Sequence, residues 1–356
     1  MIAINDLKRD EISELMSQLE QPAYRATQIC DWLFRKRATS FDQMTNLPLN
    51  LRKHLAENYT IKLVELEEEV VSPEDGATKY LLKLHDGSYI ESVFLPHQRG
   101  ATLCISSQVG CAFRCRFCAT GRMGLTRNLS PGEIVDQVNF VRFYLAESNS
   151  AEPGRGQPTR PFTNVVFMGM GEPLANFENV VKAIEIMVQE VGIGSRHITI
   201  STCAIPEKIV ELAQLPYEIK LAISLNSPSD QSRREIMPEA ARFSISEVLS
   251  AARYYYSKKK RLLTIEYVLM ADLNDSPEDA EALARLLGGL PVKINLIALN
   301  PFPGCAYKRP SARNVKKFVS LLEDRGMNVT LRKSLGSDIL AGCGQLGMLA
   351  QVKGKP

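Results

Sequence analysis

The feature that most constrains the fold of this 356-residue chain is a regular alternation of strand and helix patterns that begins near residue 102. Short apolar runs, each typical of a buried strand, alternate with stretches of helical periodicity. We expect strands at residues 102–106, 163–169, 197–201, 220–226, 263–270, 293–299 and 328–332. Repeated strand–helix units favour a parallel α/β core, either an open or a closed barrel, with functional residues at the carboxyl ends of the strands.

The first hundred residues follow a different pattern. Residues 1–58 carry apolar side chains at helical spacing and predict a small helical unit with a basic tip at residues 35–37. Residues 59–98 are rich in strand formers, and Asp86-Gly87 between two apolar runs predicts a β-hairpin. We therefore divide the chain into a helical domain at 1–58, a β-rich extension at 59–98, a barrel core at 99–335 and a C-terminal loop and tail at 336–356. The polar, Pro- and Gly-rich residues 147–161 predict a surface insertion.

The composition is that of an ordinary globular protein, with 45% hydrophobic and 23% charged residues. The N-terminus lacks the apolar segment of a secretory signal, and no apolar run is long enough to span a membrane, so we expect a cytoplasmic protein. In such a protein the eight cysteines are expected to be reduced, metal-binding or catalytic. The net charge of +3 neither requires nor excludes a nucleic-acid partner.

Cys111, Cys115 and Cys118 form a C-x3-C-x2-C motif in the loop after the first expected barrel strand. The motif has no fourth cysteine, and no histidine lies within ten residues of it. Three thiolates suit a 4Fe-4S cluster that leaves one iron open to a small ligand, whereas a closed zinc or electron-transfer site needs four ligands. The alternatives are a structural zinc site or three unrelated thiols. The flanking Phe113 and Phe117, which would shield a cluster from water, favour the cluster.

Gly169-Met-Gly-Glu172 follows an apolar strand, in a turn whose glycines let the backbone approach a ligand closely. A tight strand-to-helix turn would explain this motif equally well, but its position one strand after three cysteines favours a cosubstrate site. Polar residues also follow later strands, and each is expected either to bind a ligand or to cap the next helix. They are Ser201, Thr202, Ser224, Asn226 and Asn300.

Together these motifs resemble the radical S-adenosylmethionine (SAM) superfamily, and within it the RlmN/Cfr group of RNA adenine methyltransferases. The resemblance extends from Tyr24 to Leu346 and includes the segments 24–26, 44–48, 103–111, 169–174, 265–268, 293–297 and 336–346. The segment Asn300-Pro-Phe-Pro-Gly304 and the N-terminal helical unit are similar to the RlmN branch. The resemblance implies a partial (β/α)6 barrel with a small N-terminal RNA-binding domain, in which the three cysteines bind a 4Fe-4S cluster.

The resemblance also implies methylation at C2 of an adenosine, a carbon too electron-poor for ordinary methyl transfer. One SAM molecule would methylate Cys343, and a second, bound to the open iron, would yield a 5′-deoxyadenosyl radical that takes a hydrogen from this methyl group. The methylene radical would add to C2, and Cys104 would release the product by forming a transient disulfide with Cys343. Glu91 would accept a proton. The implied SAM contacts are Gly171, Glu172, Ser201, Ser224, Leu225, Asn226 and Asn300.

The residues themselves support part of this scheme. A lone buried cysteine is usually structural, but a sulfur that carries a methyl group needs a second sulfur to resolve the product, and thiol–disulfide exchange forms and resets such a bond. Cys343 also lies between two glycines, which favours a mobile loop over a packed core. Glu91 is not distinguished by its spacing, because a strand glutamate is usually solvated. Cys203 and Asn226 stand where the family commonly has serine and histidine, and Asn226 cannot titrate near neutral pH.

The implied partners are 23S rRNA, tRNA, an electron donor such as flavodoxin and a thiol reductant, and we expect a monomer. The basic runs at residues 35–37, 258–261 and 308–317 are either phosphate contacts or solvated faces. Two other functions stay open at this point. One is a Cfr-like enzyme that methylates C8, and the other is a non-catalytic, metal-stabilised RNA-binding protein.

Overall fold

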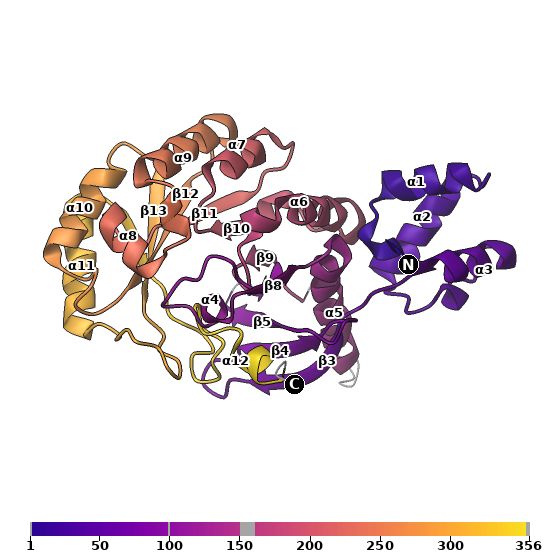
Figure 1. Ribbon diagram of the computed structural model, residues 1–356, viewed down its shortest axis with the longest axis horizontal. Coiled ribbons are helices and arrows are strands. Elements are labelled where there is room, and N and C mark those ends of the chain that lie inside the picture. Colours follow the sequence, from indigo (N-terminus) through magenta and orange to yellow (C-terminus); the bar gives the residue numbers. More distant parts are fainter. Residues whose placement is uncertain (1, 99, 150–160, 354–356) are drawn as a thin grey trace.

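The computed structural model describes residues 2–98, 100–149 and 161–353. Within them the main sheet has ten strands in the order β14-β13-β12-β11-β10-β9-β6-β5-β4-β3 (Figure 1). The parallel strands are β6 Gly100–Cys104, β9 Asn164–Phe167, β10 Ile198–Thr202, β11 Lys220–Ser224, β12 Leu263–Leu269, β13 Val292–Ala298 and β14 Asn328–Leu331. The predicted partial (β/α)6 barrel is confirmed, with β14 added at one edge and three antiparallel strands at the other.

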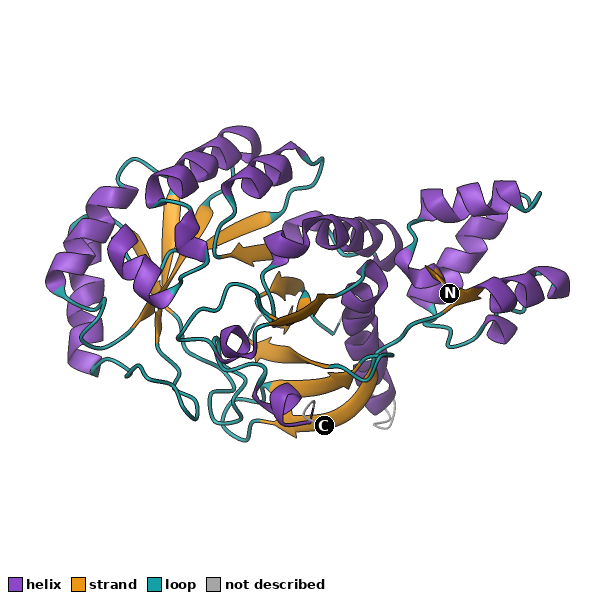
Figure 2. Cartoon of the chain, viewed as in Figure 1, coloured by secondary structure: helices purple, strands orange, loops and turns teal. Residues whose placement is uncertain are grey.

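Helices from the connections cover the outer face of the parallel strands (Figure 2). They are α5 Pro131–Asn149, α6 Phe177–Ile186, α7 Pro206–Gln214, α9 Ile245–Lys259, α10 Pro277–Leu287 and α11 Ala312–Asp324. The short helix α8 Asp230–Ile236 lies instead beside residues 113–117, where Arg116 N donates to the Ile236 carbonyl at 2.9 Å. A capping box starts α5, in which Ser130 N donates to Glu133 Oε2 at 2.9 Å and Glu133 N donates to Ser130 Oγ at 3.3 Å. Most buried apolar side chains of these helices and strands form one core, and a second, smaller cluster includes Ile236 of α8. The inner face of the barrel is left for the site.

The N-terminal helical unit projects from one end of the molecule (Figure 1). It contains α1 Arg9–Gln18, α2 Tyr24–Cys30 and α3 Leu49–Asn58, and the short strands β1 Ile2–Ala3 and β2 Tyr59–Thr60 pair at its base. Arg37 joins this unit to the barrel, because its guanidinium donates twice to Asp136 of α5 at 2.9 Å and once to the Val64 carbonyl at 2.8 Å. Within the basic tip at 35–37, the charge of Arg37 is therefore paired inside the protein, while Arg35 and Lys36 are exposed.

The β-rich extension continues the barrel sheet. Strands β3 Glu65–Val71, β4 Thr78–Lys83 and β5 Tyr89–His97 are antiparallel, and β5 pairs with β6. The predicted hairpin joins β4 to β5, and Gly87 takes the left-handed conformation in its turn, with φ +84°. Residues from this extension therefore share one sheet with the parallel strands.

Short elements and the C-terminal segment complete the inner face. Strand β7 Gln108–Gly110 pairs with β8 Leu125–Asn128, and α4 Ala119–Met123 lies between them. The chain end returns across the sheet to α12 Met348–Lys353, which lies beside the antiparallel strands (Figure 1). The predicted insertion at 147–161 lies mostly outside the described residues. Among the residues that are described, no helix is long and apolar enough to cross a membrane.

Candidate active site

The cysteine motif occupies the loop between β7 and α4. Gly110 lets this loop turn, because it has φ +75° and a Cβ atom there would lie 1.9 Å from the Gly124 carbonyl oxygen. The N–H of Cys111 donates to the same carbonyl at 2.8 Å. Phe113 and Phe117 are buried in a small apolar cluster beside the motif. The three cysteines thus line one cavity with an apolar wall.

The donors around this cavity suit an iron–sulfur cluster better than a single metal ion. Burial raises the pKa of Cys111, and the neighbouring Cys118 raises it further, so thiolates here need a positive partner. No three His, Cys, Asp or Glu side chains within the described ranges could hold one metal ion. A cluster binds each thiolate at a different iron, and it therefore accepts thiols that are spread around a cavity. The residues present fit a 4Fe-4S cluster.

Glu172 ties the ends of β9 and β10 together under this cavity. Its Oε1 accepts from Leu174 N at 2.9 Å and from Thr202 Oγ1 at 2.7 Å, and its Oε2 accepts from Cys203 N at 2.7 Å. Burial raises the pKa of this carboxyl, while the three donors favour its ionised form. Gly171 is required beside it, because φ is +101° and a Cβ would lie 2.6 Å from the Gln108 side chain.

The structure brings most of the predicted SAM contacts to one place. Ser201, Ser224, Gly171, Glu172 and Asn226 line the cavity of the three cysteines. The side chain of Asn226 is also used internally, because its Oδ1 accepts from Val268 N at 2.8 Å. Leu225 lies between two of these residues and is buried.

Asn300 is placed differently from the other predicted SAM contacts. Its Nδ2 donates to the Cys343 carbonyl at 3.2 Å, and its Oδ1 accepts from Arg309 at 3.4 Å. A Cβ atom on Gly342 would lie 2.9 Å from this amide nitrogen. In the structure, Asn300 therefore holds the loop that carries Cys343.

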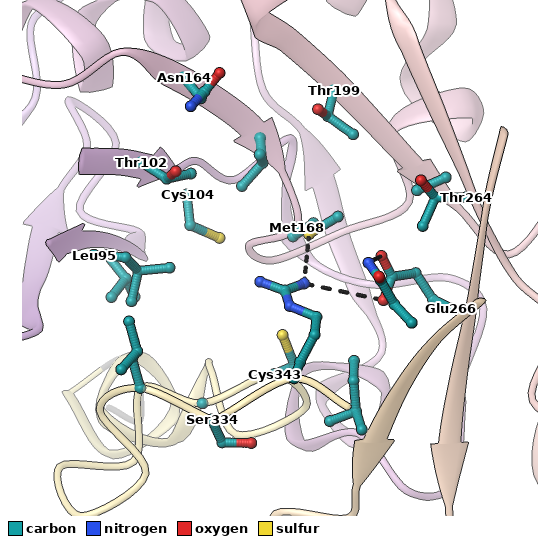
Figure 3. A pocket seen from close by; sticks show the side chains of 18 of the residues that line it. Leu95, Thr102, Cys104, Asn164, Met168, Thr199, Thr264, Glu266, Ser334 and Cys343 are labelled. Atoms are coloured by element: carbon teal, nitrogen blue, oxygen red, sulfur yellow. Dashed lines mark hydrogen bonds and ion pairs between the residues drawn. The ribbon is translucent and has the colours of Figure 1, made fainter. Parts of the chain in front are cut away.

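Cys104 and Cys343 face each other across a larger pocket of about 470 Å³ (Figure 3). Cys104 ends β6 and is buried, whereas Cys343 comes from the C-terminal segment and is exposed to the pocket. Burial raises the pKa of Cys104 to about 12, and Cys343 adds to this shift. Although the Cys343 side chain is open to the pocket, the pocket walls around it still raise its pKa by desolvation, and Arg332 opposes that shift. All eight cysteines of the chain are free thiols in the structure.

Glu91 lies on β5 beneath the C-terminal segment and is fully buried. Its Oε1 accepts from the backbone N–H groups of Leu349 and Ala350 at 3.0 and 3.1 Å, at the start of α12. Its Oε2 lies 3.6 Å from the ammonium nitrogen of Lys79. Burial raises the pKa of Glu91, and Lys79 opposes this shift. Glu91 is therefore not solvated, although most glutamates on strands are.

Four polar residues of the site escaped the sequence analysis: Lys79, Glu266, Asn295 and Arg332. Each is a polar residue within or beside an apolar strand, and this interruption of the apolar pattern could have marked them as candidates for the site. Arg332 Nη1 lies 4.0 Å from Glu266 Oε2, and Asn295 Nδ2 donates to Glu266 Oε1 at 2.9 Å. Glu266, Asn295 and Arg332 line the larger pocket.

Comparison with known proteins identifies the family. Residues 105–287 match the model of the radical SAM superfamily, and residues 2–61 match that of the ribosomal RNA large subunit methyltransferase N-terminal domain. The chain is 44% identical over 345 residues to the probable dual-specificity RNA methyltransferase RlmN of Clostridium botulinum strain Alaska E43, and the alignment covers 96% of this chain and 95% of that relative. This chain belongs to the RlmN family. A second RlmN, from Anaeromyxobacter dehalogenans, is 42% identical and covers 96% of this chain and 91% of its own length.

A solved structure supports the same assignment. The radical SAM methyltransferase from Sphaerobacter thermophilus is 40% identical, has a TM-score of 0.89, and covers 98% of this chain and 99% of its own. In this RlmN-family chain the superfamily match starts one residue after Cys104 and ends at α10. Cys343 and Arg332 therefore lie outside the superfamily match.

Proposed function

We propose that this radical SAM RNA methyltransferase adds a methyl group to C2 of an adenosine in 23S rRNA and in tRNA. The single observation that carries the proposal is the placement of Cys104 and Cys343 across one pocket that adjoins the cavity of the three-cysteine motif. Methylation of a carbon through a sulfur carrier needs one sulfur to hold the methyl group and a second to release it. The printed names of the relatives, dual-specificity RNA methyltransferases, support RNA as the substrate.

Cys111, Cys115 and Cys118 would hold the 4Fe-4S cluster, and Glu172, Ser201, Ser224 and Asn226 would contact SAM, two molecules of which are used per turnover. With SAM bound, the cluster supplies a carbon-centred radical that abstracts a hydrogen atom. Gly171 lets the backbone approach the ligand, and the buried aromatic rings beside the motif keep water away from it.

Cys343 would carry the methyl group. Its exposed thiol reaches the pocket, and Arg332 favours the thiolate, which is the form that accepts a methyl group. After the methyl group loses one hydrogen atom, its carbon adds to C2 of the base. The adduct would then lose its unpaired electron to the oxidised cluster and its C2 hydrogen as a proton, which restores a closed-shell thioether between Cys343 and the base. Asn300 positions the loop through the Cys343 carbonyl, so that the sulfur stays on the pocket side.

Cys104 would release the product. Its thiolate attacks the sulfur of Cys343, a disulfide forms, and the carbon–sulfur bond breaks with its electron pair moving to the methylene carbon, which then takes a proton. A thiol reductant must reopen the disulfide. We keep Glu91 as the proposed acceptor of the C2 proton. Because Glu91 lies beneath α12, this role requires the C-terminal segment to move away.

The remaining assignments follow from this reaction. We propose that residues 1–58 form an RNA-binding accessory domain, that 59–98 extend the barrel core of 99–335, and that 336–356 form the catalytic loop and tail. An electron donor such as flavodoxin would reduce the cluster. The protein would act as a monomer in the cytoplasm, where ribosomes and tRNA are found.

The test is to map the product formed from rRNA and tRNA by the reconstituted enzyme and by Cys343→Ala. We expect 2-methyladenosine from the unaltered enzyme, none from the variant, and a brown protein with about four irons in both. Methyl groups on C8 would show a Cfr-like enzyme. A colourless zinc protein whose function survives Cys343→Ala would show a non-catalytic RNA-binding protein.

A further inference from the structure

Two buried hydrogen-bond acceptors in the larger pocket are left without partners. Glu266 of β12 and Asn295 of β13 are in register on adjacent parallel strands, and they are 5% and 7% exposed. Asn295 Nδ2 donates to Glu266 Oε1 at 2.9 Å. The other oxygens, Glu266 Oε2 and Asn295 Oδ1, have no hydrogen-bond partner in the described part of the chain. Buried polar atoms are nearly always paired, so these two point to a ligand.

The position of the pair indicates which ligand this is. Glu266 and Asn295 line the same pocket as Cys104 and Cys343, and Figure 3 shows Glu266 on the opposite wall from Cys104, with the Arg332 guanidinium in front of it. Glu266 also lines the cavity of the three-cysteine motif, so the pair lies where that cavity opens into the larger pocket. A volume of about 470 Å³ accommodates a base that has been turned out of its stack.

A donor stands beside the two acceptors. Arg332 Nη1 lies 4.0 Å from Glu266 Oε2 and 3.9 Å from Met168 Sδ, and Arg332 is close enough to Cys343 to oppose the rise of its pKa. Two acceptors next to one donor complement a base that has an exocyclic amine beside a ring nitrogen. Adenine has this pattern, as cytosine does, whereas guanine places the carbonyl oxygen O6 where adenine has its amine.

We propose that Glu266 and Asn295 accept hydrogen bonds from the exocyclic amine of the target adenine, while Arg332 donates to a ring nitrogen beside it. This inference rests on the proposed function, because it takes the base of an RNA substrate as the ligand of the larger pocket. The pair then selects adenine over guanine, since a base that turns a carbonyl toward two buried acceptors leaves all three oxygens unpaired.

The first test needs no variant. Two RNA substrates are compared that differ at the target position, one with adenosine and one with purine riboside, which lacks the exocyclic amine. We expect the unaltered enzyme to lose about 10- to 100-fold in kcat/KM on the purine substrate, because both acceptors stay unpaired. Equal kcat/KM values on the two RNAs would overturn the proposal while leaving RNA methylation itself established. If neither RNA is methylated, the proposed function fails instead.

The second test assigns the discrimination to this pair. Glu266→Gln keeps the side-chain shape but can turn an amide donor toward the pocket, so it should lower kcat/KM on the adenosine RNA by at least tenfold and leave the purine RNA nearly unaffected. Glu278→Gln makes the same chemical change at an exposed position of α10 and should keep the preference for adenosine. Circular dichroism checks that the variants fold.

A binding measurement separates the RNA base from SAM as the ligand. The affinities of the unreduced enzyme for both RNAs and for SAM alone are measured by equilibrium titration. We expect Glu266→Gln and Asn295→Leu to remove the difference in affinity between the two RNAs and to leave SAM binding within about twofold. Weakened SAM binding with an unchanged preference for the adenosine RNA would contradict the proposal, because the pair would then belong to the SAM site.

Discussion

The ammonium nitrogen of Lys79 lies 3.6 Å from Glu91 Oε2, and neither side chain is more than 1% exposed. Both residues also hold the C-terminal segment. Lys79 donates to the Leu340 carbonyl at 3.2 Å, and Glu91 accepts from two N–H groups at the start of α12. Cys343 lies between these two attachment points, so the buried ion pair fixes both ends of the loop that would carry the methyl group.

Lys79→Met should strongly destabilise the protein. It leaves the Glu91 carboxylate buried without its positive partner, which costs about 3–5 kcal/mol. Hydrogen exchange of residues 336–353 should also become faster. Lys353→Met is the control, because its 3.1 Å ion pair with Glu67 lies at the surface and should contribute nothing measurable. Equal effects of the two variants on chemical denaturation would contradict this account of the C-terminal segment.

The stability of the protein should depend on pH through Glu91. Burial raises the pKa of Glu91 above its ordinary value of 4.5, so the folded state binds this proton more tightly than the unfolded state does. The contribution of Glu91 is complete below about pH 4.5 and is lost as the pH rises through the folded-state pKa.

Denaturant unfolding of the unaltered protein and of Glu91→Gln between pH 4 and pH 8 measures this effect. The variant should gain stability relative to the unaltered protein as the pH rises. A difference between the two proteins that stays constant with pH would show that the carboxyl of Glu91 does not hold its proton more tightly in the folded state.

Alkylation of Cys104 should rise steeply with pH. Its pKa of about 12 means that the thiolate fraction increases about tenfold per pH unit throughout the neutral and mildly alkaline range. Peptide mass spectrometry after iodoacetamide treatment at pH 7, 8, 9 and 10 follows each cysteine separately. The labelling rate should show no plateau up to pH 10, and a plateau near pH 8 would refute the effect of burial on this thiol.

Cys203 should not be a cluster ligand, although its Sγ lies only 3.8 Å from Cys115 Sγ. Thiolates that bind different irons of one cluster do not touch, so we expect Cys203 to pack against Cys115 without taking a corner of its own. Cys203→Ser should therefore retain about four irons per chain, and Cys115→Ser should lose most of its iron. Iron analysis after anaerobic reconstitution measures both, and equal losses would make Cys203 a fourth ligand.

Most of the fold could be predicted from the sequence because the buried parallel strands are apolar runs, and each such run from β6 to β13 was visible. The edge strand β14 was also predicted, although it is mostly exposed. The three-cysteine motif was equally visible because its ligands are close in the chain. The Glu266–Asn295 pair was not, since its members are 29 residues apart and meet only through strand register. The burial of Glu91 likewise depends on contacts with residues 258 and 259 positions away.

Arg37 of the basic tip at residues 35–37 has a partner that the sequence could not reveal. Arg35 and Lys36 are exposed, but Arg37 is paired with Asp136, 99 residues away, where the helical unit meets the barrel. Sequence gives the charge of a residue and its local helix, but it does not show which distant element will cover it.

Cys343 is proposed to carry the methyl group before the RNA receives it, and SAM with a trideuterated methyl group distinguishes this route from direct transfer. The product methyl group is analysed by mass spectrometry. We expect two deuterium atoms in the new methyl group of the RNA, because one is abstracted while the group is on Cys343 and a proton replaces it on release. Three deuterium atoms would show direct transfer from SAM and rule out Cys343 as the carrier.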